Sequence, residues 1–325
     1  QGLIAIGRGV FAGFTGNRFC LSEAYLPHAW PIAYRITLED PIVGIAGTGN
    51  GVVALTNGAP YFITGTDPAA ITPIRIDLAQ ACVNKHSIVD MGPYVLYAAP
   101  DGLVAVSGSG GEVVSKGIVS VEQWNSDFKP TLIKAFRHEG TYVAFYNDGG
   151  SLGGWVFDPR STESSFSTIT VSSEIHGGYY DPEDGELYLI AEDGDNDRVR
   201  RYRGSSNSRT ARFKSKKFVT PNPTSMAWVS VHADTYPATA GSDVALQIKV
   251  YADSTLIAHY TLVKNSANNF TQTTTTPGGI SSGTLREPIM RLPVATAYEW
   301  EVEVSGTGII NEICLAQSTD EIRRA

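Results

Sequence analysis

The chain has 325 residues, 42% hydrophobic and 18% charged, which is ordinary for a folded protein, and its formal net charge is −8. No run approaches the roughly 18 apolar residues of a transmembrane helix, and no signal-peptide pattern stands at the start, so we expect no membrane span and no export by that route. Cys20, Cys82 and Cys314 are widely spaced and odd in number, which indicates free thiols rather than a disulfide framework. The sequence opens at Gln1 and leads at once into a strand-like segment, so we also expect that an upstream segment is missing.

The first strands that the sequence predicts are residues 10–14 and 18–22, with a turn at 15–17 between them. We expect these two strands to end a first β-repeat. Residues 23–31 contain two prolines and Trp30, a composition that predicts an ordered loop.

A repeated pattern starts at residue 42: an Ile-led apolar strand, a turn, a β-rich strand, a tight turn and a last apolar strand. In the first copy Asn57-Gly58 predicts a two-residue hairpin, because both residues tolerate φ > 0. The copies begin 46, 45 and 42 residues apart, close to the roughly 40–50 residue period of four-stranded propeller blades. Because one small sheet cannot bury its own apolar face, the pattern predicts a β-propeller of ~45-residue repeats over residues 1–207. The leading residues of the four copies are Ile42, Ile88, Ile133 and Ile175.

The repeat pattern stops after Gly204, and the polar residues 205–208 predict the crossing into a second unit. Beyond them the predicted strands are longer, and residues 298–304 (YEWEVEV) alternate as a half-buried antiparallel strand does. We predict a β-sandwich over residues 208–325. Its Thr- and Gly-rich insert, residues 265–283, has almost no large apolar residue, so we expect a long exposed loop or arm there. No long amphipathic helix is predicted anywhere, and the predicted fold class is therefore all-β.

Motifs for catalysis, cofactors and metals are missing from the sequence. The six histidines have no HExxH or equivalent ligand spacing, and no serine lies in a GxSxG elbow. Asp193, Asp195 and Asp197 alternate as in a calcium loop, but Arg198 and Gly204 stand where that loop needs Gly and Glu. This pattern favours a solvated acidic turn. We expect no catalytic residue, no cofactor and no metal site.

Four carboxylates, Asp158, Asp181, Glu183 and Asp184, are candidates for a pair that hydrolyses glycosides. Asp158 and Asp181 each precede a proline, however, and Asp before Pro is typical of a turn opener. We therefore favour turns at these positions over a catalytic pair.

Residues 198–217 hold nine Lys and Arg and no acid, whereas the rest of the chain has 16 basic and 33 acidic residues, a balance of −17. Their alternation places the charges on one face of predicted strands. Three interpretations stay open: a subunit interface with an acidic neighbour, a solvated face, or a contact with DNA phosphates. We favour the interface, because the chain is otherwise acidic. Its candidate residues are Arg198, Arg200, Arg201, Arg203, Arg212, Lys214, Lys216 and Lys217.

Short segments spread over most of the chain carry a family resemblance. They are residues 19–23 (FCLSE) with Trp30-Pro31, 65–68 (GTDP), 97–102 (YAAPDG), 214–218 (KSKKF) with Pro221 and Pro223, 291–293 (RLP), 300–306 (WEVEVSG) and Leu315-Ala316. In order and spacing they resemble the tail nozzle, or tail tubular, proteins of short-tailed bacteriophages.

The resemblance implies a virion structural protein without catalytic residues, assembled in the host cytoplasm into the tail. It implies a homo-oligomeric ring, usually of six copies, that contacts other tail proteins such as the adaptor, a fibre or a needle. Genome DNA would pass through this ring without specific binding, and an acidic wall suits that passage because it repels a polyanion. The alternative is a carbohydrate-engaging tail protein, either a lectin-like binder or a glycan depolymerase.

Overall fold

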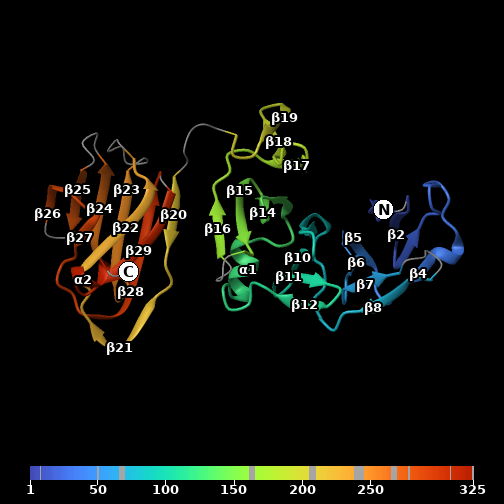
Figure 1. Ribbon diagram of the computed structural model, residues 1–325, viewed down its shortest axis with the longest axis horizontal. Helices are drawn as coiled ribbons and strands as arrows, with labels where there is room; N and C mark the ends of the chain where they lie inside the picture. Colours follow the sequence, from blue (N-terminus) through green and yellow to red (C-terminus); the bar gives the residue numbers. More distant parts are fainter. Residues whose placement is uncertain are drawn as a thin grey trace. The chain divides into compact units, whose positions relative to one another are not determined.

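The computed structural model describes residues 1–7, 9–49, 51–65, 70–160, 165–204, 210–237, 245–264, 269–276, 279–307 and 309–323. It confirms the predicted all-β class, since antiparallel strands make up both of its units (Figure 1). The chain divides into two compact units, Gln1–Gly204 and Ser205–Ala325. The predicted border between residues 207 and 208 lies outside the described residues. Within the described ranges, no helix is long and apolar enough to cross a membrane.

The described residues of the first unit form five small antiparallel sheets, each with its strands in chain order. The first sheet consists of β1 (Ile4–Ala5), β2 (Phe11–Thr15), β3 (Arg18–Leu21) and β4 (Arg35–Thr37). The second consists of β5 (Ile42–Thr48), β6 (Gly51–Thr56), β7 (Tyr61–Thr64) and β8 (Thr72–Arg75). The third consists of β9 (Val89–Asp90), β10 (Val95–Ala99), β11 (Gly102–Ser107) and β12 (Gly110–Val113). The fourth consists of β13 (Lys134–His138), β14 (Thr141–Asp148), β15 (Ser151–Asp158) and β16 (Ser165–Ile169), and the fifth of β17 (Ile175–Tyr180), β18 (Leu187–Asp193) and β19 (Asn196–Arg201).

The repeat pattern of the sequence corresponds to these sheets, with three corrections. Residues 10–14 and 18–22, expected at the end of a first repeat, form β2 and β3 in the middle of the first sheet. Asn57-Gly58 does not close a two-residue hairpin: β6 and β7 pair only as far as Ala54 and Tyr61, and the Thr56 hydroxyl instead accepts from Gly58 N–H at 3.0 Å. A helix that the sequence did not predict, α1 (Val121–Asp127), buries Trp124 between the third and fourth sheets.

Each sheet of the first unit shares a buried cluster with the next one in the chain. The four clusters join the first sheet to the second, the second to the third, the third to the fourth and the fourth to the fifth. In β10, Val95 and Tyr97 face the second sheet while Leu96 and Ala98 face the fourth, so the strand is buried on both faces and its residues are continuously apolar. No cluster in the described part of the chain joins the fifth sheet to the first.

The second unit has a seven-stranded sheet and a three-stranded sheet whose buried residues form one core. In the larger sheet the strand order is β20 (Ala211–Lys214), β28 (Ala297–Gly306), β23 (Leu246–Ala252), β24 (Thr255–Lys264), β25 (Phe270–Thr276) and β26 (Gly279–Leu285), and β21 (Phe218–Thr224) also pairs with β28. The smaller sheet consists of β27 (Ile289–Arg291), β22 (Trp228–Thr235) and β29 (Ile309–Ala316), and α2 (Thr319–Ile322) follows it.

The expectation of a long exposed loop over residues 265–283 is wrong. Most of this insert forms the hairpin of β25 and β26, and β25 also pairs with β24 from His259–Thr275 to Lys264–Phe270. Threonine has a high strand propensity, and the five threonines of β25 let the sheet continue with few large apolar side chains.

Candidate functional site

The eight basic residues that the sequence proposes as an interface are divided between the two units. Four belong to the first unit, on β19 and the turn after it, and four to the second unit, on β20 and in the link to β21. Each group is therefore described within its own unit.

In the first unit all four candidate arginines lie beside carboxylates of the same unit. The Asp193 carboxylate lies 2.8 Å from Nε of Arg198 and 3.1 Å from Nη2 of Arg200. Arg201 lies 3.4 Å from Glu186, and Arg203 lies 3.6 Å from Glu139. All three acidic partners precede residues 198–217 in the sequence. Asp193 lies on β18, which pairs with β19 and so brings its carboxylate beside the arginines.

In the second unit the partners come from the alternating glutamates of β28. Arg212 pairs with Glu303 at 2.9 Å, and Lys214 pairs with Glu301 at 3.4 Å. Lys217 pairs with Glu299 at 2.7 Å.

Glu303 is 3% exposed although it lies on the side of β28 opposite the core. Its carboxylate lies beside the guanidinium of Arg212 and 3.6 Å from the ammonium of Lys249. It also accepts a hydrogen bond from the Tyr251 hydroxyl at 3.1 Å. Burial raises the pKa of the Glu303 carboxyl, but the hydrogen bonds from Arg212 and Tyr251 and the charge of Lys249 outweigh it, so the pKa lies below its usual value. The carboxylate therefore stays ionised and holds three strands together.

Lys216 is exposed like the other seven candidates, but unlike them it forms no ion pair within the described residues. Near it in the sequence, Phe213, Phe218 and Val219 are 56%, 49% and 67% exposed. Among the described strands, β20 and β21 each pair with β28 alone and so form the edge of the seven-stranded sheet. We call Phe213, Lys216, Phe218 and Val219 the edge patch.

Three of the four carboxylates considered for glycoside hydrolysis, those of Asp158, Asp181 and Asp184, are engaged in turns. Asp158 accepts both the backbone N–H and the guanidinium of Arg160. Asp181 accepts from Glu183 N–H at 2.9 Å, and Asp184 accepts from Glu186 N–H at 2.8 Å. These contacts are those of turn-opening aspartates, as the sequence predicted.

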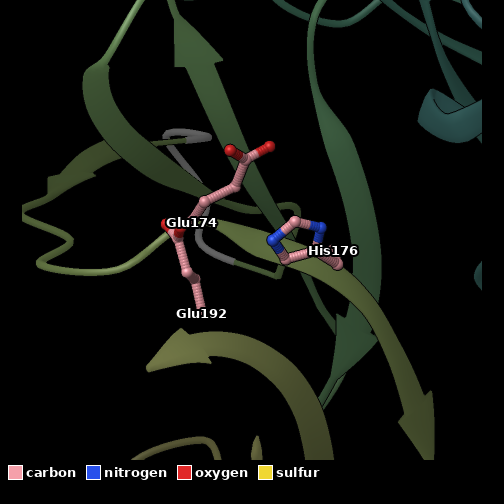
Figure 2. Close-up of side chains that lie close together, drawn as sticks. All are labelled: Glu174, His176 and Glu192. Atoms are coloured by element: carbon pink, nitrogen blue, oxygen red, sulfur yellow. The ribbon is translucent and has the colours of Figure 1, made fainter. Parts of the chain in front are cut away.

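The structure also gathers three side chains that the sequence did not connect (Figure 2). Glu174, His176 and Glu192 each place one metal-ligating atom within 4.8 Å of the others. His176 is the additional residue of a β-bulge, since β17 and β18 pair at Ile175–Ala191 and next at Gly177–Ile190. The spacing Glu-x-His at 174–176 was visible in the sequence, but the bulge and the partner on β18 were not.

Glu174 is fixed by neighbours from the fourth sheet. Asn147 Nδ2 donates to Glu174 Oε2 at 2.5 Å, and Lys134 Nζ lies 3.5 Å from Glu174 Oε1. The hydrogen bond from Asn147 lowers the pKa of the Glu174 carboxyl, and the positive charge of Lys134 adds to this against the opposing effect of burial. A cavity of about 140 Å³ between the fourth and fifth sheets is lined in part by Lys134, Asn147 and Glu174.

A groove of about 420 Å³ opens in the second unit where β22, β24, β25 and β27 meet. Trp228 and Tyr260 give it aromatic walls, and Gln272, Thr274 and Arg291 give it polar groups. A volume of this size is typical of a small-molecule site.

No protein-family model matches the chain, and no curated protein matches it. Among solved structures it is similar to the N-terminal domain of Nup159, with a TM-score of 0.36, 8% identity, and coverage of 95% of this chain and 89% of that chain. For dihydro-heme d1 dehydrogenase NirN the TM-score is 0.38 and the identity 9%, over 95% of this chain and 56% of NirN. For the WD40 domain of SCAP from fission yeast the TM-score is 0.33 and the identity 8%, over 94% of this chain and 95% of that chain. Similarities of this size assign neither a family nor a function.

Proposed function

We propose that the chain is a non-catalytic structural protein of a short bacteriophage tail, a nozzle that forms a ring-shaped channel for the exit of genome DNA. In this proposal the first unit is a β-propeller and the second a β-sandwich. The stacking of successive small sheets through shared clusters supports the propeller. The single core between two sheets supports the sandwich.

The observation that carries the proposal is the pairing of segments that resemble the nozzle family. Residues 214–218 lie beside residues 300–306, although 87 positions separate Ser215 from Val302. Ser215 N–H donates to Val302 O at 2.8 Å, and Val302 N–H donates to the Ser215 hydroxyl at 3.0 Å. Short matches far apart in the sequence thus form one structural neighbourhood, which supports a shared fold over chance agreement.

The edge patch is the surface that we assign to the contact between subunits. Seven of the eight basic candidates already have carboxylate partners in their own unit, so their charges are largely balanced before any neighbour arrives. Exposed aromatic residues are what the core of a protein interface contains, and β20 adds an unpaired strand edge. The proposed contact is therefore apolar, with Lys216 supplying the available charge.

The same ion pairs support passage of DNA without binding. A cation that already has a carboxylate partner gains less from a phosphate, because fewer counterions are released when the two meet. We expect weak binding of duplex DNA at physiological salt, and weaker binding as the salt concentration rises.

Electron microscopy of the purified full chain in negative stain tests the proposal, together with native mass spectrometry for the copy number. The expected result is a ring with a central opening. A particle that stays monomeric at all concentrations, or an assembly without an opening, contradicts it.

The groove at Trp228 favours a second candidate function, a lectin-like carbohydrate binder of a phage tail. An aromatic face with amide, hydroxyl and guanidinium groups around it suits a sugar. None of the described residues that line the groove carries a carboxylate, so this observation favours a binder over a depolymerase. Glycan-array binding that Trp228→Ala abolishes would support this function, and an empty array would remove it.

A further inference from the structure

The Glu174–His176–Glu192 cluster brings two carboxylates and one imidazole together on the fifth sheet (Figure 2). A third carboxylate, that of Asp197 on β19, lies 3.7 Å from Nε2 of His176. We propose that this cluster binds one divalent transition cation of the Zn²⁺ class. The inference is independent of the proposed role in a phage tail.

The first support is an uncompensated negative charge. Glu192 lies directly opposite Asp197 in the β18–β19 pair, and its N–H donates to the backbone carbonyl of Glu174 at 2.9 Å. Like charges at opposing positions of a sheet destabilise it. In the described part of the chain Lys134 is the one Lys or Arg paired with these carboxylates, so the three carboxylates and Lys134 together carry −2. A divalent cation balances this charge.

The second support is the way in which the ligands are held. Glu174 is positioned by Asn147 and Lys134, contacts of the kind that orient ligating carboxylates in metal sites. The β-bulge inserts His176 between the paired positions Ile175 and Gly177, and its imidazole lies in the cluster with Glu174 and Glu192. The ligands come from the chain before β17, from β17 and from β18, and a bound cation would connect these segments.

The mixture of ligand atoms indicates which cation fits. Imidazole nitrogen favours Zn²⁺ and its neighbours among the transition metals, whereas Ca²⁺ and Mg²⁺ favour oxygen alone. Bonds of about 2.0–2.2 Å to Zn²⁺ place two ligand atoms at most about 4.4 Å apart. The ligand atoms here lie within 4.8 Å of one another, and because His176 and Glu192 are exposed, small side-chain rotations bring them to that spacing.

Calorimetric titration of the tag-free full chain with Zn²⁺ tests the inference. We expect one cation per chain, and His176→Gln and Glu192→Gln should each weaken the affinity at least about tenfold. Glu183→Gln, in the turn before β18, is the matched control and should leave the affinity unchanged. Circular dichroism checks that the variants fold, and Asp197→Asn, with an expected smaller loss, is a second variant at the same site.

Three outcomes would overturn the inference. They are a titration without heat up to millimolar Zn²⁺, equal binding by the unmodified chain and by both His176→Gln and Glu192→Gln, and binding of Ca²⁺ as tight as that of Zn²⁺. The last would indicate a hard-cation surface in which the imidazole takes no part. A rise in melting temperature with Zn²⁺ that both variants lose gives independent support, because a cation that binds only the folded chain stabilises it.

Discussion

The guanidinium of Arg212 lies 2.9 Å from the carboxylate of Glu303, a side chain that is only 4% exposed. Arg203 and Glu139 form a pair of the same chemistry, but their side chains are 63% and 64% exposed. The two pairs therefore separate the effect of burial from the effect of charge.

Arg212→Ala should destabilise the second unit by about 1–3 kcal/mol, because it removes a partner from a buried carboxylate. Arg203→Ala should cost less than about 1 kcal/mol, since an exposed pair is screened by water and salt. Urea denaturation with hydrogen exchange of β28 and β14 as separate readouts measures the two units. Equal losses would show that the burial of Glu303 does not strengthen its pair.

Acid should destabilise the second unit in two steps. Burial lowers the pKa of His259, and Lys249 lowers it further against the opposing effect of Glu303. Because the folded-state pKa lies below the unfolded value of 6.5, the ring contributes stability above that value and loses it as the pH falls through the folded-state pKa. The lowered pKa of Glu303 has the same sign and acts below its ordinary value of 4.5.

His259→Gln should therefore flatten the decline in stability below pH 6.5 while leaving the decline below pH 4.5 in place. Glutamine suits the position because it can keep the contact that His259 Nε2 makes with Gln247 at 3.2 Å. Urea midpoints of the β28 transition at pH 7.5, 6 and 4 provide the measurement. An unchanged slope between pH 7.5 and 6 would assign the first step to another group.

Leu96→Ala should destabilise the first unit by about 2–5 kcal/mol, since Leu96 is fully buried between the third and fourth sheets. Val199→Ala on β19 is the control, because Val199 is 69% exposed and its truncation should change stability by no more than about 0.5 kcal/mol. Chemical denaturation compares the two. A loss near that of the control would mean that the third sheet unfolds independently of its neighbours.

The strands could largely be predicted from the sequence, because alternation and turn residues are local signals. The Asn147–Gly150 turn shows this: Gly149 and Gly150 adopt φ of 59° and 97°, as a two-residue hairpin requires. The prediction of a hairpin at Asn57-Gly58 failed because the pairing of β6 with β7 ends at Ala54 and Tyr61. In the loop beyond it, the N–H of Gly58 donates to the Thr56 hydroxyl. A local signal of this kind does not fix where the ladder ends.

The partners of the charged residues could not be predicted, because they depend on strand order. Arg212 meets Glu303 only since β20 pairs with β28, which follows it by more than 80 residues. Residues 198–217 hold nine basic residues and no acid, which suggested a positive surface that pairs with an acidic neighbour. The fold supplies most of those partners. The proximity of His176 and Glu192 likewise arises from a bulge in the register of β17 and β18.

The edge patch should be needed for assembly if the proposed ring forms through it. Phe213 on β20 and Phe218 on β21 are 56% and 49% exposed at the sheet edge, and a monomer gains nothing from leaving two aromatic rings in water. Phe213→Ser with Phe218→Ser should therefore abolish or greatly weaken the ring while the monomer stays folded by circular dichroism. Tyr179→Ser on the fifth sheet, where the ring is 62% exposed, is the matched control and should leave assembly intact.

Lys216→Glu separates an apolar contact from an electrostatic one. If the rings of Phe213 and Phe218 provide most of the interface energy, this reversal should weaken assembly only modestly, and high salt should reduce the difference from the unmodified chain. Sedimentation velocity at low and high salt measures both variants. Should Lys216→Glu prevent assembly while the double serine variant assembles normally, charge rather than aromatic burial would hold the contact. Normal assembly of both variants would place the subunit interface elsewhere on the chain.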